Sequence, residues 1–324
     1  MTKKKTVLIF GISSFVGSNL AEYLKTKYRV VGTYYNNKVT LPGIVTLPCN
    51  ILKKDQIQTI LYTFRPDLTI YAVGLSSLMD CYDYPKLADA LNAVGVFNTS
   101  QFSERYGSKF CFLSSGFIFS GHKGEYREND TPLPNTVYGN TMGSSEFYVQ
   151  KSCLNYLIFR CCRLYGRNYN INQLNFFEVL ERNFEQGKST PCDMKVFTGY
   201  LDVIYLARAI EAALEQNIRN RLFQLCSQNI CTSYDFAKTY ATVFGAGEGQ
   251  ITKGDWSFPA ENLKYDLSRD DENFYYQLGT FNIEATLGIK IPTVEASLIE
   301  TKNRLSPSAG AKKSVRKASG ISFI

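Results

Sequence analysis

The strongest constraint on the fold is an alternation of short apolar runs with longer amphipathic stretches in the first half of the chain. We expect the apolar runs to form strands at Thr6–Phe10, Arg29–Thr33, Ile44–Leu47, Leu68–Ala72, Lys109–Ser114 and Leu157–Arg160. We expect the stretches between them to form helices at Ser14–Lys27, Lys54–Phe64, Lys86–Tyr106 and Tyr138–Lys151. Apolar strands that alternate with helices are typical of a parallel sheet covered on both faces. Because crossovers between parallel strands are right-handed, this pattern predicts a doubly wound α/β fold.

The turn after the first expected strand is bounded by two glycines. Gly11 and Gly17 enclose Ile12-Ser13-Ser14-Phe15-Val16, and the first expected helix begins inside this segment. Glycine permits the tight turn and the close backbone approach that a pyrophosphate needs, and the helix N-terminus attracts its negative charge. A turn of this kind between a strand and a helix predicts a Rossmann-type dinucleotide site.

The second expected strand ends without the acidic residue that usually binds the ribose hydroxyls of NAD. Its end reads Thr33-Tyr34-Tyr35-Asn36-Asn37-Lys38. The missing carboxylate and the nearby Lys38 favour NADP, with NAD as the second choice of cofactor. Lys38 could equally be an ordinary solvated loop charge.

The pattern changes after Gly166. Helices are expected at Gln173–Gln186, Leu201–Gln216, Ser233–Phe244 and Thr293–Leu305, with a short strand at Leu222–Cys226. We therefore expect a dinucleotide-binding Rossmann domain at residues 1–165 and a smaller substrate-binding lobe at 166–305, some segments of which return to the main sheet. Residues 306–324 are rich in Ser, Ala, Gly and Lys, which predicts a basic, disordered tail.

Charge and hydropathy disfavour two classes of partner. The net charge of +7 comes from the chain ends, namely Lys3, Lys4, Lys5, Lys312, Lys313, Arg316 and Lys317. The body between them is formally neutral, so we expect no nucleic-acid partner for the fold itself. No run approaches the roughly 20 apolar residues that a membrane helix needs, so we expect no membrane partner.

Cysteine and histidine usage narrows the chemistry further. The nine cysteines are scattered without a C-x-x-C pair, and His122 is the only histidine. We expect neither a metal site nor a disulfide framework, and reduced thiols indicate a cytoplasmic protein. A Ser-His-Asp hydrolase is disfavoured because the single histidine lies in a glycine-flanked turn.

A long central run carries the most specific pattern. Ser114-Ser115-Gly116-Phe117-Ile118-Phe119-Ser120-Gly121 is followed by a segment from Glu125 to Pro132 and then by Tyr138-Gly139-Asn140-Thr141-Met142. The run resembles the dTDP-4-dehydrorhamnose reductase family of extended short-chain dehydrogenases/reductases. That family has patterns close to S-T-D-Y-V-F-D-G, Y-x-E-x-D-x-P-x-P and Y-G-x-x-K-x-x-x-E. The chain is also similar to the regulatory subunit of methionine adenosyltransferase, a relative within this family. The resemblance extends from the glycine turn to about Arg304.

The resemblance implies a catalytic centre in which one residue is changed. Tyr138 matches the tyrosine that exchanges a proton with the substrate carbonyl, and Ser115 matches the residue that hydrogen-bonds the reacting oxygen. Met142 occupies the position of the lysine that lowers the tyrosine pKa and holds the nicotinamide ribose. A thioether supplies neither charge nor donors. Losing the cation should raise the tyrosine pKa by about 1–3 units and reduce its reactive form roughly ten- to thousandfold.

Four other positions depart from the family pattern. Ser14 stands in place of a glycine in the phosphate turn, and Asn50 in place of an aspartate near the adenine. Gly116 replaces an aspartate after Ser115, and Gly199 falls in the usual P-T-Y-V-D stretch. Together with Met142, these changes indicate a relaxed constraint on catalysis.

The motif and the resemblance together define two sets of candidate site residues. The cofactor set is Gly11, Ser14, Phe15, Val16, Gly17, Tyr35, Asn36, Lys38, Asn50, Ile51, Ala72, Val73, Gly74, Asn92, Ser114 and Tyr138. The implied substrate is a nucleotide-linked sugar held between the two lobes by Leu75, Ser76, Ser115, Phe117, Asn175 and Tyr200. Asn175 could instead simply begin a helix.

Two functions remain open at this point. The first is an NAD(P)-dependent nucleotide-sugar reductase or epimerase with weak or altered catalysis, in which Lys195 or the substrate itself supplies a base. The second is a catalytically inactive nucleotide-binding subunit that regulates a partner protein. The chain could therefore form a homodimer or join a partner protein.

Overall fold

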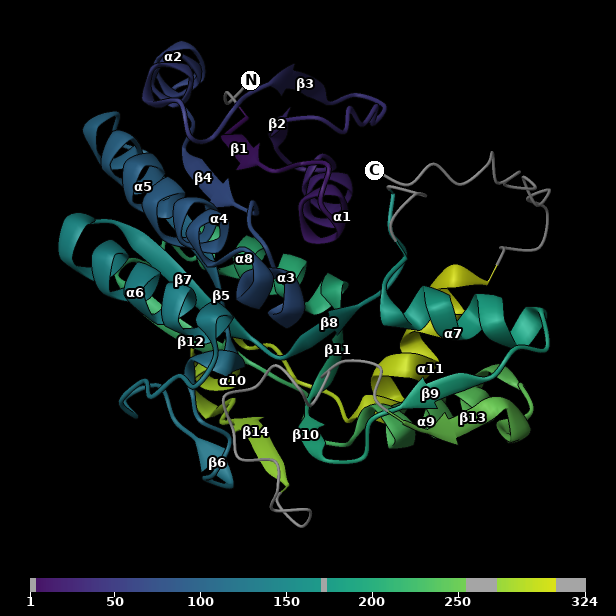
Figure 1. Ribbon diagram of the computed structural model, residues 1–324. Coiled ribbons are helices and arrows are strands. Elements are labelled where there is room, and N and C mark those ends of the chain that lie inside the picture. Colours follow the sequence, from purple (N-terminus) through teal and green to yellow (C-terminus); the bar gives the residue numbers. More distant parts are fainter. Residues whose placement is uncertain (1–3, 170–173, 255–272, 307–324) are drawn as a thin grey trace.

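The computed structural model describes residues 4–169, 174–254 and 273–306. Its centre is a seven-stranded parallel sheet with the order β12-β7-β5-β4-β1-β2-β3 (Figure 1). The strands are β1 (Thr6–Phe10), β2 (Arg29–Tyr34), β3 (Val45–Pro48), β4 (Leu68–Tyr71), β5 (Lys109–Ser115), β7 (Tyr156–Cys161) and β12 (Arg221–Leu225). The chain begins at β1, proceeds outward to β3, and then restarts beside β1 at β4. This reversal confirms the predicted doubly wound, Rossmann-type fold.

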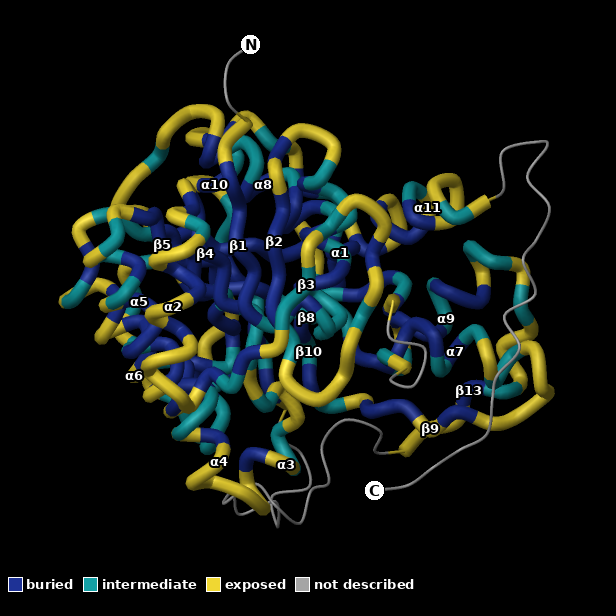
Figure 2. Tube along the Cα trace, turned by 90° about the horizontal axis from the view of Figure 1, so that it is seen from above, coloured by how far each residue is buried: buried dark blue, intermediate teal, exposed yellow. Residues whose placement is uncertain are grey.

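Alternate residues of the strands pack into two separate cores. Val7 and Ile9 of β1 face the core that contains α1 (Phe15–Leu24) and α8 (Val203–Glu215). Leu8 and Phe10 face the opposite core, which contains α2 (Lys54–Phe64), α5 (Gly95–Arg105) and α6 (Val137–Ser152). The inner strands are therefore buried on both sides, which explains why they are mostly apolar; Figure 2 shows β1 in dark blue as buried. The edge strand β3 is exposed or half-buried along its length.

The helix predicted at Lys86–Tyr106 is one continuous helix whose middle turn is π-helical. It consists of α4 (Pro85–Asp89), the π-helical turn η1 (Ala90–Val94) and α5. The buried Tyr71 hydroxyl donates a 2.6 Å hydrogen bond to the carbonyl of Leu91 in this turn. A Cβ at Gly95 would lie 2.3 Å from the same hydroxyl oxygen. A wider helical turn at this point lets the helix accommodate the tyrosine.

The second half of the chain contributes to both the main sheet and a smaller lobe. Helix α8 covers the sheet and β12 forms its edge, so segments after Gly166 do return to the main sheet. The lobe contains α7 (Phe176–Glu185), α9 (Ser233–Phe244), α11 (Val294–Leu305) and the strand pair β9 (Thr190–Cys192) and β13 (Ile251–Lys253) (Figure 1). A second pair, β8 (Arg163–Tyr165) and β11 (Tyr200–Asp202), lies between lobe and sheet.

Several short elements were not predicted. They are α3 (Leu78–Asp83), η2 (Gly116–Ile118), β6 (Glu125–Tyr126), β10 (Val196–Thr198), η3 (Glu248–Gln250), β14 (Phe274–Leu278) and α10 (Phe281–Leu287), besides the two strand pairs of the preceding paragraph. The helix predicted at Leu201–Gln216 begins at Val203 in the structure, two residues later than predicted, because Leu201 and Asp202 belong to β11. The Asp202 side chain instead caps α8 by accepting a 2.9 Å hydrogen bond from the Ile204 N–H. Residues 307–324 of the tail predicted at 306–324, and the start of the helix predicted at Gln173–Gln186, lie outside the described residues.

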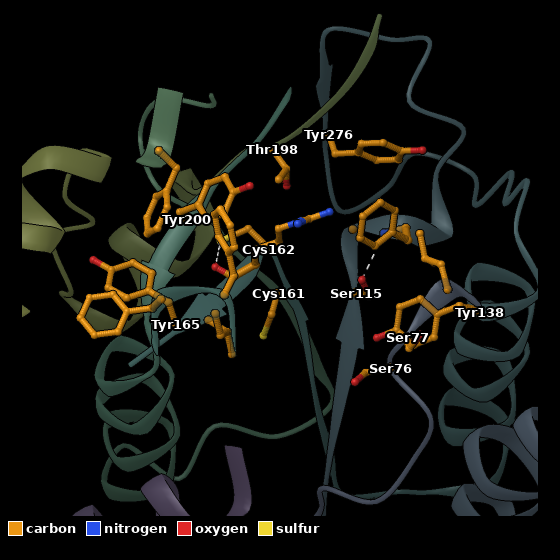
Figure 3. A pocket seen from close by; sticks show the side chains of 18 of the residues that line it. Ser76, Ser77, Ser115, Tyr138, Cys161, Cys162, Tyr165, Thr198, Tyr200 and Tyr276 are labelled. Atoms are coloured by element: carbon orange, nitrogen blue, oxygen red, sulfur yellow. Dashed lines mark hydrogen bonds between the residues drawn. The ribbon is translucent and has the colours of Figure 1, made fainter. Parts of the chain in front are cut away.

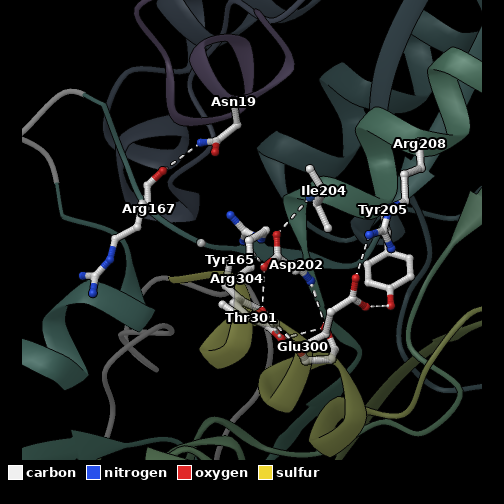
Figure 4. Close-up of polar contacts among 12 residues, drawn as sticks. Asn19, Tyr165, Arg167, Asp202, Ile204, Tyr205, Arg208, Glu300, Thr301 and Arg304 are labelled. Carbon is white, nitrogen blue, oxygen red and sulfur yellow. Dashed lines mark hydrogen bonds and ion pairs between the residues drawn. The ribbon is translucent and has the colours of Figure 1, made fainter. Parts of the chain in front are cut away.

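Asp202 also holds the last helix of the lobe. Its buried carboxylate accepts a 2.6 Å hydrogen bond from Thr301 and pairs with Arg304, both on α11 (Figure 4). On the same helix, Ser297 accepts a 2.6 Å hydrogen bond from the Tyr165 hydroxyl. These contacts attach α11 to β8, β11 and the start of α8. Among the described residues, no helix is both long and apolar enough to cross a bilayer.

A buried ion pair joins α6 to the sheet. Arg160 of β7 and Glu146 of α6 are 3% and 2% exposed, and their closest contact is 2.7 Å. The Glu146 carboxylate also accepts a 2.6 Å hydrogen bond from the Ser114 hydroxyl at the end of β5. The remaining arginine nitrogen donates to the Glu128 carbonyl at 3.0 Å. Every charged group of the pair therefore has a close partner, as burial of charge requires.

We expect Glu146→Ala to lower the free energy of unfolding by about 3–5 kcal/mol, because Arg160 would remain buried without its counterion. Urea denaturation would measure the loss. Glu22→Ala, which breaks the partly exposed pair with Lys25, is the control and should cost less than about 1 kcal/mol. Equal losses in the two variants would contradict the special role of the buried pair.

Candidate functional site

The turn between β1 and α1 requires both of its glycines. Gly11 has φ +85°, and a Cβ there would lie 2.5 Å from the Ala72 carbonyl oxygen. A Cβ at Gly17 would lie 2.2 Å from the carbonyl oxygen of Gly11. The backbone therefore approaches β4 and folds back on itself more closely than any side chain allows.

Ser14 takes the place of a glycine and uses its hydroxyl within its own turn. It is the N-cap of α1, and its hydroxyl accepts a 3.0 Å hydrogen bond from the Gly17 N–H. The same hydroxyl donates to the Gly11 carbonyl at 2.8 Å. Both interactions turn the side chain back onto its own loop. Phe15 and Val16 begin the helix, where N–H groups have no intrahelical acceptor.

Two adjoining cavities surround this turn. The first, of about 490 Å³, is lined by predicted residues Gly11, Ser14, Tyr35, Asn50, Ile51, Ala72, Val73 and Gly74. The second, of about 300 Å³, is lined by predicted residues Ser14, Phe15, Val16, Ala72, Val73, Gly74, Leu75, Ser76, Asn92, Ser114, Ser115, Tyr138 and Met142. We call these the outer and inner cofactor cavities. The two cavities adjoin at shared walls formed by Ser14 and by Ala72–Gly74, and we call them together the trough.

Three predicted cofactor residues line neither cavity. Gly17 is buried inside α1, whereas Asn36 and Lys38 are exposed on the loop after β2. Asn37, which was not predicted, lines the outer cavity together with Thr33 and Tyr34. The sequence of this loop does not indicate which of its residues line the cavity.

Asn92 lies in the wall of the inner cavity and fixes the loop after β4. Its side chain accepts a hydrogen bond from the Leu75 N–H and donates one to the Leu75 carbonyl, both at 2.9 Å. Gly74 has φ +152°, and a Cβ there would lie 2.4 Å from the Asn92 amide oxygen. Through Asn92, the π-helical turn thus fixes the loop after β4, where the two cavities meet.

Tyr138 and Ser115 lie together where the inner cavity opens toward the smaller lobe. Thr136 caps α6, so that Tyr138 is in its first turn, and a Cβ at Gly139 would lie 2.1 Å from the Phe117 carbonyl. This close approach of α6 to η2 brings the phenol beside Ser115. Burial raises the pKa of Tyr138 to about 12, and the hydrogen bond with Ser115 only partly opposes that effect.

Met142 lies one turn after Tyr138 and lines the inner cavity. It is 5% exposed and packs in the core beneath α6. No lysine is among the described residues that line the inner cavity or the substrate cavity, and Lys195, the substitute base considered from the sequence, lines neither. Among the described lining residues, no other lysine therefore takes the place of the missing one.

A third cavity of about 500 Å³, the substrate cavity, opens beyond Tyr138 (Figure 3). Predicted residues Ser76, Ser115, Phe117 and Tyr200 line it, whereas Leu75 lies in the inner cofactor cavity. Six residues, Ser76, Ser115, Tyr138, Cys161, Cys162 and Leu164, line both of these cavities. The three cavities therefore follow one another, with Ser115 and Tyr138 at the second junction.

Asn175 does not line the substrate cavity. Its amide forms a capping box with Glu178 at the start of α7 and donates a 2.8 Å hydrogen bond to the Gly166 carbonyl. This is the ordinary helix-start role that the sequence left open. Sequence reasoning missed Arg163, Tyr165, Thr198, Phe236 and Tyr276, which do line the cavity. Arg163 and Tyr165 follow Arg160 within a recognised stretch, but strand alternation alone did not indicate their direction.

The chain matches a known family along almost its whole length. Residues 5–305 match the family model described as RmlD substrate binding domain. Methionine adenosyltransferase 2 subunit beta of Danio rerio is 22% identical over 248 residues, covering 75% of each chain.

Two crystal structures share the fold. One is dTDP-4-dehydrorhamnose reductase from Bacillus anthracis in complex with NADP, with a TM-score of 0.77, 18% identity, and coverage of 93% of this chain and 99% of that one. The other is UDP-glucose 4-epimerase from Thermotoga maritima with UDP-glucose, with a TM-score of 0.76, 19% identity, and coverage of 92% and 97%.

We expect Ser14→Gly to leave NADPH affinity within about threefold of the native value, because the hydroxyl faces its own loop. Fluorescence titration would measure the affinity. Ser14→Ala removes the cap and should lower stability by about 1 kcal/mol, whereas Ser14→Gly should cost only a few tenths. A tenfold gain in affinity for the glycine variant would show that the serine obstructs the cofactor.

Proposed function

The chain belongs to the family described as the RmlD substrate binding domain, and from that premise we propose that it binds NADP and a nucleotide-linked sugar and slowly reduces a sugar carbonyl. The single observation that carries this proposal is the position of Ser115 and Tyr138. They lie at the junction of a trough that begins at a phosphate turn and ends in a second large cavity.

The chain's own residues fit a dinucleotide. The glycine turn provides the close backbone approach that a pyrophosphate needs, and Phe15 and Val16 at the N-terminus of α1 line the inner cavity. None of the described residues that line the outer cavity is acidic, and Tyr35 and Asn37 offer neutral polar groups there. This composition accommodates the 2′-phosphate of NADP. The cofactor, when bound, would supply the hydride.

Tyr138 is suited to one direction of the reaction. With a pKa near 12 the phenol stays protonated at neutral pH, so it can donate its proton to the carbonyl oxygen as negative charge develops there. The Ser115 hydroxyl lies beside it and can donate a hydrogen bond to the same oxygen. The reverse oxidation needs the phenolate, which is scarce at neutral pH without the lysine. Met142 therefore biases the site toward slow reduction.

Met142 also favours a second candidate function. A protein that keeps its cofactor trough and has lost the catalytic cation could act by binding alone. Its similarity to methionine adenosyltransferase 2 subunit beta makes a subunit role the specific form of this alternative. Cofactor binding without any turnover of keto sugars by the native protein would favour this second function over the first.

We expect Met142→Lys to raise alcohol oxidation at pH 7.5 by roughly ten- to thousandfold, because the ammonium would lower the pKa of Tyr138. Native oxidation should rise about tenfold per pH unit between pH 7 and 9.5, since only the phenolate accepts the proton. Initial rates with dTDP-, UDP- and GDP-linked sugars would test both statements.

Two variants control that experiment. Met142→Leu conserves the volume without adding charge and should give no gain, whereas Tyr138→Phe should abolish turnover in both directions. A gain in the leucine variant, or a flat pH profile for native oxidation, would contradict the proposed role of the tyrosine pKa.

We expect Asn37→Asp to weaken NADPH binding more than NADH binding. A carboxylate in the outer cavity would repel the 2′-phosphate and accept hydrogen bonds from the free ribose hydroxyls. Paired titrations with the two cofactors would measure the change in preference. Asn36→Asp places the same charge on the exposed neighbour and should shift the preference less. A larger effect at Asn36 would contradict the assignment of the inward-facing residue.

A further inference from the structure

Two cysteines lie side by side where β7 and β12 end. In the parallel register Cys161 is opposite Leu225, so the next residues along the two strands, Cys162 and Cys226, are opposite each other. The Cys162 N–H donates a 2.9 Å hydrogen bond to the Leu225 carbonyl, which continues the ladder past the last paired residues. Opposed residues of neighbouring strands have Cα atoms about 5 Å apart, within the roughly 4.4–6.8 Å that a disulfide spans. The backbone therefore already provides the spacing that an S–S bond needs.

The two thiols are free and interact with each other. A hydrogen bond from the Cys162 thiol lowers the pKa of Cys226, and the N–H groups of Leu278 and Gly199 act in the same direction. Burial of the Cys226 sulfur opposes these bonds only in part. The sulfur of Cys226 is thus surrounded by donors that stabilise a thiolate, which is the nucleophilic form of cysteine.

Gly199 makes this arrangement possible. A Cβ at Gly199 would lie 2.3 Å from the Cys226 sulfur and 2.8 Å from the Ser227 hydroxyl oxygen. The Gly199 carbonyl accepts a 3.1 Å hydrogen bond from the Arg163 N–H, which holds the glycine in place. The departure from the family pattern at this position therefore has a structural reason, because a residue with a Cβ could not bring its N–H to the sulfur.

The two cysteines differ in access. Cys226 is 0% exposed. Cys162 is half-buried and lines both the substrate cavity and the inner cofactor cavity, and Figure 3 shows it on the wall between Tyr200 and Ser115. A small solute that enters either cavity therefore meets Cys162 first, with Cys226 behind it.

Cys161 lines the same two cavities but belongs to the other side of the sheet. It is part of the core that contains α1 and α8, whereas Cys226 is part of the opposite core. Successive residues of a strand point to opposite faces, so Cys161 is directed away from Cys226. Burial raises the pKa of the Cys161 thiol to about 12, which keeps it protonated at neutral pH. Cys161 is therefore a matched control for Cys162.

We propose that Cys162 and Cys226 are a reversible redox pair that a hydroperoxide oxidises to a disulfide at the junction of the cofactor and substrate cavities. This inference goes beyond the proposed function, because it concerns the thiols alone and requires neither a cofactor nor a sugar. In reducing compartments, disulfides of this kind are transient and typically sense oxidants.

The chemistry proceeds in two steps. The Cys162 sulfur attacks one oxygen of hydrogen peroxide as its proton passes to Cys226; the O–O bond breaks, hydroxide leaves, and Cys162 becomes a sulfenic acid. The Cys226 proton then neutralises that hydroxide, and the Cys226 thiolate attacks the Cys162 sulfur. An S–S bond forms, the S–O bond breaks, and a second hydroxide leaves. From two thiols, the pair loses two electrons and two protons, and hydrogen peroxide becomes two molecules of water.

The test is to treat the reduced, full-length protein with hydrogen peroxide, block the remaining thiols with N-ethylmaleimide, and map the linked peptides by mass spectrometry without reduction. We expect a Cys162–Cys226 disulfide that dithiothreitol reverses. Cys161→Ser should leave its yield unchanged. Cys226→Ala should abolish it, and Cys162 should instead persist as a sulfenic acid that dimedone traps.

Three results would overturn the proposal. They are native protein in which Cys162 and Cys226 both stay free, a linkage of Cys162 to Cys161, and a native Cys162 sulfenic acid that dimedone traps as readily as in Cys226→Ala. The map of the native protein decides the question even if a variant fails to fold. NADPH titration of the reduced protein reports separately on the proposed function, because the peroxide experiment contains no cofactor.

Discussion

The buried pair of Arg160 and Glu146 is the interaction on which the rest of the site depends. It joins β7 to α6, and through the Ser114 hydroxyl it also holds the end of β5. Ser115 is the last residue of β5, and Tyr138 lies in the first turn of α6. Ser115 and Tyr138 are thus held together by the Arg160–Glu146 pair, in which neither of them takes part. The low exposure of the pair makes the geometry stiff, because moving either element would leave a charge unpaired inside the protein.

Much of this architecture could be predicted from the sequence because the burial pattern is simple. Strands covered on both faces are continuous apolar runs, so β1, β2, β4 and β5 were predicted to within one residue of their ends, and β3 was shifted by one residue. The helix at Lys54–Phe64 was predicted with the bounds it has. The phosphate turn and the Ser115–Tyr138 pair were predicted because their spacing is characteristic of a family. These features depend on local sequence, which a single chain reveals.

The features that could not be predicted depend on contacts between distant segments. Strands such as β6 and β10 are only two or three residues long, which is too short for a period to be recognised. Tertiary packing, not composition, decides that Asn37 and Arg163 line cavities while Asn36 and Lys38 do not. Asn175 shows the converse, since its place in a family pattern pointed to a ligand while its amide is used in a helix cap.

The serine in the phosphate turn has a consequence for the free protein. Ser14 adopts an extended conformation with φ −72°, which is available to every residue, so no glycine is needed there for backbone reasons. A residue with a Cβ samples fewer conformations in the unfolded chain than glycine does, which lowers the entropic cost of folding. The turn is therefore ordered by its own side chain before any nucleotide arrives, and a ligand that binds there finds its cradle already formed.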